Sequence, residues 1–139
     1  MPDEINVQID DMPKQSINTS GAPQPIGPYV QAVRAGDLLF ISGQLPLDPT
    51  TGTLVRAGVR AQTRRVIENI KAIIEAAGGN LGSLVKITVY VKLMEDFIQV
   101  NEVYAEILGV NPPARMTLEC SKLPKDAQVA MDAIAYLGS

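Results

Sequence analysis

One arginine occupies a position from which its side chain could bind a negatively charged group. Arg115 follows the segment 111–114, which contains two prolines, and it opens the apolar run 116–120. Two prolines followed directly by a strand-like segment place the guanidinium at the mouth of a sheet. There it could hold a carboxylate through two parallel hydrogen bonds, bond a loop carbonyl, or stay in water. The position alone leaves these alternatives open.

Composition excludes several classes of catalytic site. The 139 residues include no histidine and a single cysteine, Cys120. Ser-His-Asp triads, Cys-His dyads and common zinc sites need these residue types, so we expect no metal and no cofactor. One cysteine cannot form an internal disulfide, which favours a reducing cytoplasm. We interpret Cys120 as a thiol of the core.

The charge balance argues against nucleic acid as a partner. The net charge is -3, and the first 12 residues contribute four acidic residues and no basic one. The rest of the chain is close to neutral, whereas nucleic-acid binding calls for a dominant basic patch. No apolar run reaches the roughly 18 residues of a membrane span, and the start lacks a signal-peptide pattern. We expect an acidic, mobile leader over residues 1–14 and a single domain over residues 15–139.

Apolar spacing predicts two helices. The first runs from about 59 to 77, where apolar residues recur every three or four positions before Gly78-Gly79 stop the helix. The second runs from 96 to 108. Asp96 is its expected N-cap with Gln99 three residues later, and Gly109 is its expected end.

Strands are predicted around these helices. Short apolar or alternating segments occur at 38–41, 85–91, 115–120 and about 127–136. In the second of these, the alternation places Val85, Ile87, Val89 and Val91 on one face. The order of elements predicts an α+β domain, with an antiparallel or mixed sheet and both helices on one face.

The last predicted strand is apolar on both faces. Val129, Met131, Ala133 and Ala135 alternate with a second set in which only Asp132 is charged. Helices on one side of the sheet can cover one face only, so the other needs a different cover. Self-association supplies it most simply. A coincidental apolar surface is the alternative.

The motifs of the chain, taken in order, resemble the RidA/YjgF family of reactive-intermediate deaminases. The resemblance covers about residues 16–136, and the joint order of the motifs is more specific than any one of them. In sequence they are Ile26-Gly27-Pro28-Tyr29, Gln31-Ala32-Val33, Leu39-Phe40-Ile41-Ser42-Gly43-Gln44, Asp48-Pro49-Thr50-Thr51-Gly52, Asn69-Ile70-Lys71-Ala72-Ile73, Val100-Asn101, Pro113-Ala114-Arg115 and Leu123-Pro124-Lys125-Asp126.

The resemblance implies a fold, an assembly and an activity. The fold would be chorismate-mutase-like, of the bacillus type, with a six-stranded mixed or antiparallel sheet backed by two helices. Three copies would form a homotrimer with a barrel-like centre and ligand clefts between subunits. Members hydrolyse 2-imino acids, formed from enamines of the 2-aminoacrylate or 2-aminocrotonate type, to 2-keto acids and ammonia.

The resemblance also assigns residues to the cleft. Arg115 matches the arginine that binds the substrate carboxylate, and Tyr29 matches a site tyrosine that can bond substrate or water. Other matching positions are Ser42, Gly43, Asn101 and Thr117, the last standing where the family often has cysteine. Structural alternatives are a buried Tyr29 supporting the Gly27-Pro28 turn, Ser42 bonded to backbone, and Gly43 marking a bulge.

One departure from the family affects the chemistry directly. Many active members carry a glutamate two residues into the last strand that positions or activates the attacking water, and this chain has Ala130 there. Asp132 lies on the same face of that strand, about 6.5–7 Å further along. Glu119 shares its parity with Arg115. Neither carboxylate is an evident substitute.

Three functions are therefore compared. The first is deamination of 2-imino acids, which the complete motif set favours. The second is non-catalytic binding of small carboxylates such as 2-keto acids by a sensor or partner protein, which Ala130 favours. The third is RNA cleavage, a role sometimes attached to relatives, which the missing histidine and the near-neutral charge oppose.

Overall fold

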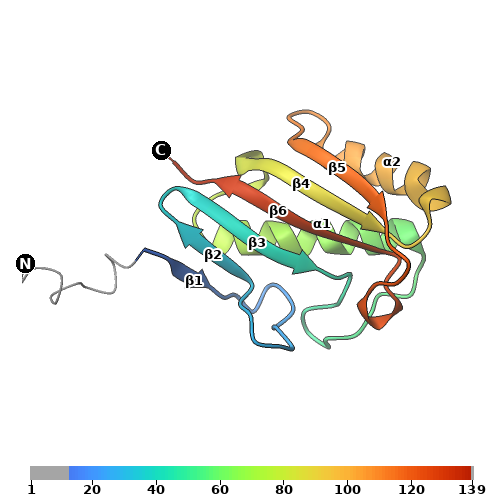
Figure 1. Ribbon diagram of the computed structural model, residues 1–139, viewed down its shortest axis with the longest axis horizontal. Helices are drawn as coiled ribbons and strands as arrows, with labels where there is room; N and C mark the ends of the chain where they lie inside the picture. Colours follow the sequence, from blue (N-terminus) through green and yellow to red (C-terminus); the bar gives the residue numbers. More distant parts are fainter. Residues whose placement is uncertain (1–12, 139) are drawn as a thin grey trace, which may run out of the picture.

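A computed structural model describes residues 13–138 as one six-stranded sheet with two helices packed against it (Figure 1). The strand order across the sheet is β1-β2-β3-β6-β4-β5. The bounds of the strands and helices are β1 Gln15–Ile17, β2 Ala32–Ala35, β3 Leu38–Gln44, α1 Val59–Ala76, β4 Leu84–Val91, α2 Phe97–Leu108, β5 Ala114–Glu119 and β6 Val129–Tyr136.

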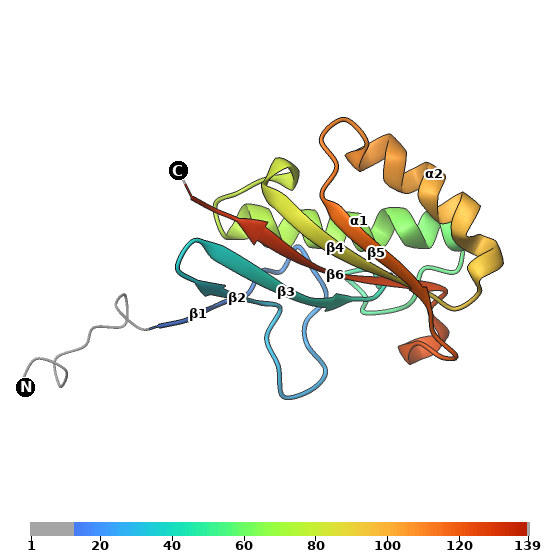
Figure 2. The same ribbon diagram turned by 45° about the horizontal axis from the view of Figure 1, so that its top comes forward.

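The sheet is mixed, and both helices lie on the same side of it (Figures 1 and 2). Strand β6 is antiparallel to both of its neighbours, β3 and β4. The parallel pair is β4 and β5, and α2 forms the crossover that parallel neighbours need. The predicted α+β class and six-stranded mixed sheet are confirmed. Neither of the helices in residues 13–138 has the length and apolar character that crossing a membrane requires.

Helix α1 provides most of the cover for the centre of the sheet. Val66, Ile67, Ile70, Ile73 and Ile74 recur at helical spacing and are fully buried. The predicted stop is confirmed in detail. Gly78 takes a left-handed φ of 95°, and the Gly78 and Gly79 amides donate to the carbonyls of Glu75 and Ile74. This pair of bonds is the Schellman motif, which satisfies the last helical carbonyls.

Strand β6 has the two faces that its sequence predicts. Val129, Met131, Ala133 and Ala135 are buried against the helix side. On the other face Ile134 is half-buried, while Tyr136 and the neighbouring Phe40 of β3 are exposed. Within residues 13–138 no helix covers this face, which we call the open face of the sheet.

Two local predictions are wrong. Val85 is exposed and Leu84 is buried in its place, because the pairing of β4 with β6 is irregular between Leu84 and Lys86. Asp96 precedes α2, but its side chain caps nothing. A turn of 3₁₀-helix, Met94–Asp96, runs directly into α2 and leaves Asp96 with helical backbone angles instead of an N-cap conformation.

Three further points concern elements that the sequence did not predict, a wrong prediction and an untested one. Strands β1 and β2 are not evident from the residue pattern, because each has at most four residues. Cys120 is half-buried just after β5, so it is not a core thiol. The acidic leader predicted for residues 1–14 lies almost wholly outside the described residues and stays a prediction.

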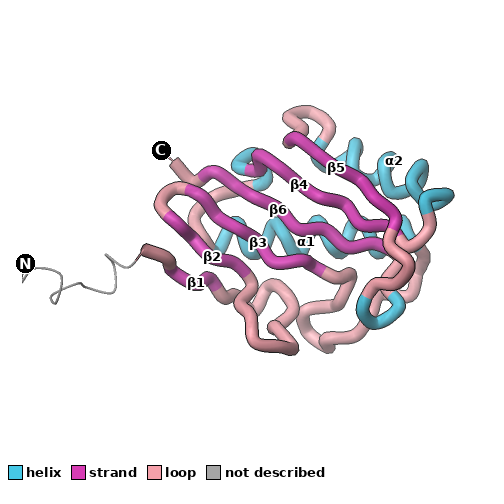
Figure 3. The backbone as a smooth tube through the Cα atoms, viewed as in Figure 1, coloured by secondary structure: helices cyan, strands magenta, loops and turns pink. Residues whose placement is uncertain are grey.

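Long loops gather at one end of the sheet (Figure 3). Residues 18–31 connect β1 to β2, and residues 45–58 connect β3 to α1. Asn69 of α1 is fully buried and donates to the carbonyls of Leu45 and Leu47, each at 3.1 Å. This amide fixes the start of the second loop to the helix, because buried carbonyls need partners.

Met131→Ala is expected to destabilise the protein by about 2–5 kcal/mol, since it opens a cavity under the central strand. Met131 is 0% exposed, whereas Met94 is 43% exposed and gives a matched control. Met94→Ala should change the free energy of unfolding by about 0.5 kcal/mol or less. Urea unfolding of both variants checks this, and equal losses would contradict the packing of β6 described above.

Candidate functional site

Arg115 lies on the helix side of the edge strand β5. It pairs with Ile87, a fully buried residue of β4, and paired residues in neighbouring strands point to the same face. Its guanidinium therefore turns toward α2. One nitrogen, Nη1, donates to Asn101 Oδ1 at 2.7 Å.

Two aromatic rings of α2 flank the Arg115 guanidinium. Its central carbon lies 4.8 Å from the centre of the Tyr104 ring and 5.4 Å from that of Phe97. Each such contact contributes about 0.5–1 kcal/mol at an exposed site. Phe97, Asn101 and Tyr104 recur at helical spacing, so one face of α2 holds the arginine. We call Arg115 with these three residues the arginine clamp.

Most hydrogen-bond donors of Arg115 in the arginine clamp remain free to bind a ligand. Within residues 13–138 no carboxylate lies within ion-pairing distance of Arg115, and Asn101 takes only one of its five N–H groups. The buried Tyr104 hydroxyl and Thr117 Oγ1 have no hydrogen-bond partner. Burial raises the pKa of Tyr104, and the positive charge of Arg115 offsets part of that rise. A ligand or an ordered water would satisfy these buried groups.

Ser42 and Gly43 form a bulge in β3. Ile41 pairs with Ala133 and Gln44 with Met131, so two residues of β3 oppose Asp132 alone. Ser42 Oγ donates to the Val30 carbonyl at 2.6 Å. Both structural alternatives named from the sequence, the bulge and the backbone bond, are therefore present.

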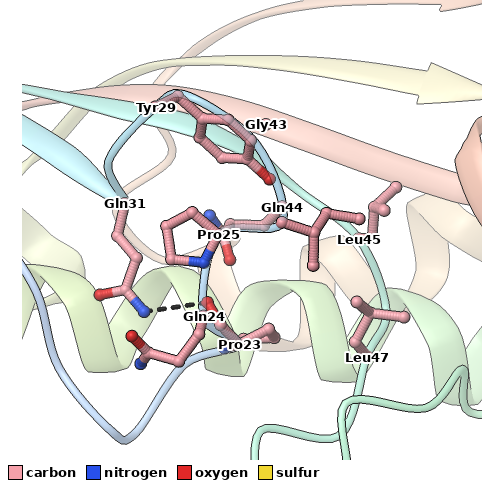
Figure 4. A pocket seen from close by; sticks show the side chains of 10 residues that line it. Pro23, Gln24, Pro25, Tyr29, Gln31, Gly43, Gln44, Leu45 and Leu47 are labelled. Atoms are coloured by element: carbon pink, nitrogen blue, oxygen red, sulfur yellow. Dashed lines mark hydrogen bonds between the residues drawn. The ribbon is translucent and has the colours of Figure 1, made fainter.

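Tyr29 borders a hollow beside this bulge (Figure 4). It is 49% exposed, so the alternative of a buried aromatic is wrong, although its amide does close the turn by donating to the Gly27 carbonyl. The hollow lies between the two long loops and is mostly apolar. Its lining consists of Pro23, Gln24, Pro25, Ile26, Tyr29, Gln31, Gly43, Gln44, Leu45 and Leu47.

A buried amide shapes that hollow. Gln31 is 1% exposed, and its two side-chain N–H groups are shared among the carbonyls of Thr19, Ala22 and Pro23, while its own oxygen accepts the Thr19 amide. Four bonds from one side chain hold the loop that carries the prolines of the hollow. This follows the rule that buried polar groups are fully bonded.

The predicted site residues fall into two groups that do not meet in one chain. Arg115, Asn101 and Thr117 lie at the β5 edge, on or facing the helix side. Ser42 and Gly43 lie on β3, three strand spacings away, which is about 14 Å. Tyr29 lies with the second group. A site that uses all six residues therefore needs two copies of the chain.

Glu119 and Asp132, the two carboxylates that could replace the family's glutamate at position 130, differ in their surroundings. Glu119 Oε1 accepts the Met94 amide at 2.7 Å, so it anchors the turn before α2. Asp132 lies on the open face, and its Oδ2 accepts the Tyr90 hydroxyl at 2.7 Å. The hydrogen bond to Asp132, with burial and the negative charge adding to it, raises the pKa of Tyr90 to about 12. In residues 13–138 no group of three acidic or cysteine side chains is placed to hold a metal ion.

Several residues around the site were not identified from the sequence. The apolar pattern indicates only core positions for Phe97 and Tyr104. It indicates no role at the site for Gln31 or Tyr90. The spacing of 97, 101 and 104 is the signal that could have found the clamp, because it places these residues on one helical face. The contact between Tyr90 and Asp132 depends on strand pairing, which spacing along one chain does not reveal.

Tyr90 is expected to lose its proton at lower pH when Asp132→Asn removes the carboxylate, with its pKa falling from about 12 toward 10.0. A raised pKa means that the protonated phenol stabilises the fold. This contribution is fully present below about pH 10 and is lost as pH rises toward 12. Absorbance titration of tyrosinate checks this, with Tyr90→Phe to identify the transition and Tyr136→Phe as control. An unchanged titration in Asp132→Asn would contradict the assignment.

Comparison with known proteins identifies relatives over nearly the whole chain. The sequence model of the family described as Endoribonuclease L-PSP matches residues 19–137. A RutC family protein of Pyrococcus horikoshii is 55% identical over 123 residues, which are 88% of this chain and 98% of the relative. A 2-iminobutanoate/2-iminopropanoate deaminase of Salmonella typhimurium is 46% identical over 124 residues, which are 87% of this chain and 96% of the relative.

Solved structures share the fold. RidA from an Antarctic Psychrobacter species superposes with a TM-score of 0.84 at 45% identity, covering 88% of this chain and 98% of that one. E. coli TdcF with bound serine superposes with a TM-score of 0.85 at 40% identity, covering 89% of this chain and 99% of that one. The fold implied by the motif resemblance is thereby confirmed, and this chain belongs to the RidA/YjgF family.

Proposed function

We propose that this protein hydrolyses reactive 2-imino acids to 2-keto acids and ammonia, in clefts between the subunits of a homotrimer. The observation that carries the proposal is the arginine clamp. It presents an always-charged, planar guanidinium that has aromatic and amide supports but no anionic partner within residues 13–138. Relatives that bear the name of this deaminase support the reaction class.

The chemistry of the substrate fits the clamp. A 2-imino acid carries a carboxylate next to the C=N carbon that water must attack. Arg115 can hold both carboxylate oxygens through two parallel hydrogen bonds, because its remaining N–H groups are unused. Fixing the carboxylate holds the imine carbon in one place and supplies the positional part of catalysis. Imines that lack a carboxylate should therefore be poor substrates.

Two features of the chain support a site shared between copies, as in the proposed trimer. The open face carries apolar residues, among them Phe40 at 43% exposure and Met116 at 60%, that a neighbouring copy would cover. The two groups of site residues lie about 14 Å apart in one chain, and a second copy can bring them together. We also propose that the protein works in the cytoplasm. A chain with one cysteine forms no internal disulfide, so it needs no oxidising compartment.

Addition of the protein to a threonine or serine dehydratase reaction should accelerate keto-acid release. Arg115→Ala should abolish most of the acceleration, by about 10²-fold or more in kcat/KM, because it removes a charge-assisted bidentate contact. Arg64→Ala is the matched control, since Arg64 is an exposed arginine paired with Glu106 on the outer side of α1 and α2. No acceleration by the unmodified protein would contradict the proposed function.

Two inactive variants should restore activity when their chains are mixed in one trimer. Gly43→Leu should block the bulge side of the cleft without harming its own chain, because a Cβ at Gly43 meets no atom within 4 Å. Co-expression of Gly43→Leu with Arg115→Ala should recover about one quarter of wild-type activity. Each site takes Arg115 from one chain and Gly43 from another, and random mixing makes both intact in about one site in four. Separately purified trimers combined without subunit exchange are the control. No recovery would contradict a site shared between copies.

Ala130 favours a second function, the binding of small carboxylates without turnover. Losing a general base lowers rates by about 10²–10⁴-fold, so a pocket that kept Arg115 could bind a 2-keto acid and turn over little. Calorimetry with 2-ketobutyrate separates the two functions. Binding that needs Arg115, with no effect on imine hydrolysis, would favour this second function over deamination.

RNA cleavage, to which the family description refers, has no support in the residues of this chain. The sequence has no histidine for acid-base chemistry and 12 basic against 15 acidic residues. A net charge of -3 opposes a polyanion, since phosphate contacts supply most of nonspecific affinity.

A further inference from the structure

Asp132 is the residue of β6 that lies opposite the β3 bulge. The pairing of β3 with β6 sets Ser42 and Gly43 opposite Asp132 alone, so this residue faces both of them across one strand spacing. Bulges occur next to active sites, where they redirect the groups of the bulged strand. The geometry thus places a charged, half-buried side chain beside two residues that match the family's cleft.

Tyr90 fixes the orientation of that carboxylate. Its hydroxyl donates to Asp132 Oδ2 at 2.7 Å across neighbouring strands. With a pKa of about 12, Tyr90 keeps its proton and remains a donor at neutral pH. Within residues 13–138 the other oxygen, Oδ1, accepts no hydrogen bond. One oxygen is held and the second remains able to bind a water.

Ala130 permits this arrangement. Tyr90 pairs directly with Ala130, while Thr88 pairs with Asp132, so the Tyr90 side chain reaches diagonally past Ala130 to its acceptor. A methyl group offers no competing acceptor at the nearer position. A glutamate there would lie closer to the Tyr90 strand position than Asp132 does, and it would compete for the hydroxyl.

Glu119 is a poorer candidate for the same role. Its carboxylate holds the Met94 amide at the entry to α2, and it belongs to β5 rather than to the β6 strand beside the bulge. Asp132 is oriented by a side chain and faces the cleft residues of β3. The two carboxylates named from the sequence are therefore not equivalent.

We propose that Asp132 is the proton-transfer residue of the deaminase site and that Tyr90 is its positioning residue. The proposal rests on the proposed function. The oxygen of a water bound at Asp132 forms a bond to C2 of the imine, and the C=N π electrons pass to nitrogen. Asp132 takes the proton released by the water and gives a proton to that nitrogen, which yields a neutral carbinolamine.

The second half of the reaction uses the same carboxylate. Asp132 accepts the proton of the new hydroxyl group, the C=O bond forms, and the C–N bond breaks. The departing nitrogen takes the proton and leaves as ammonia. Both protons of the water have then moved to nitrogen and its oxygen remains in the 2-keto acid, so the atoms balance and Asp132 returns to its starting state.

Three variants test the proposal with imine hydrolysis as the readout. Asp132→Asn should lower kcat by about 10²–10⁴-fold while KM and the binding of 2-ketobutyrate stay unchanged, because Arg115 still holds the carboxylate. Asp132→Glu should keep a measurable part of the activity that Asp132→Asn loses. Glu119→Gln is the matched control, since it also converts a carboxylate to an amide, and its kcat should stay near that of the unmodified protein.

The role of Tyr90 is tested by a double-mutant cycle. Tyr90→Phe should lower kcat by about 10-fold, the effect of one hydrogen bond to a charged group. In the Asp132→Asn background the same change should have no further effect, because Tyr90 acts through the carboxylate. Independent losses would mean that Tyr90 has a structural role only and would overturn its part of the proposal.

The two proposals fail in different ways. An unmodified protein that does not accelerate imine hydrolysis would overturn the proposed function, and this inference with it. An active protein whose Asp132→Asn variant keeps full kcat would leave the function standing and overturn the role of Asp132. An active protein in which Glu119→Gln loses as much activity as Asp132→Asn would also overturn it.

Discussion

The pairing of β6 with both β3 and β4 is the constraint on which the rest of the structure depends. Among the described residues 13–138, the halves of the sheet, β1–β3 and β4–β5, are joined by hydrogen bonds through this strand. Its alternate residues fill the core against α1, and the intervening ones set the character of the open face. Since a strand has a period of two, one register fixes both sets at once. The core and the environment of Asp132 are therefore specified together.

The same sheet separates the two parts of the proposed site. Arg115, the proposed anion-binding group, lies on the helix side of the β5 edge, where α2 supports it. Groups suited to handling water belong to the bulge and to the open face, where Asp132 and Tyr90 meet. In one chain the two sets lie on opposite faces of the sheet, because Arg115 and Asp132 belong to different strands and point to different sides. Association of copies is the means by which this architecture can join the two.

The sequence predicts the long elements well and the cross-strand contacts poorly. Periodicity identifies α1, α2 and β6, because each buries one regular stripe over at least eight residues. It fails at Val85, where an irregular register exchanges the faces, and at β1 and β2, which are too short to show a period. Motifs supply the positions of Arg115 and Asn101 but not their contact. That contact and the Tyr90–Asp132 bond join residues that are distant in sequence, so only the fold reveals them.

The position of β6 also governs when the chain can fold. It is the last of the described strands along the chain, yet it occupies the interior of the sheet. As long as β6 is unpaired, a formed β3 and a formed β4 each expose an edge beside the apolar side of α1. Such edges pair readily with other chains, and nonlocal pairing forms slowly. An intermediate in which β6 is not yet paired would therefore be prone to aggregation.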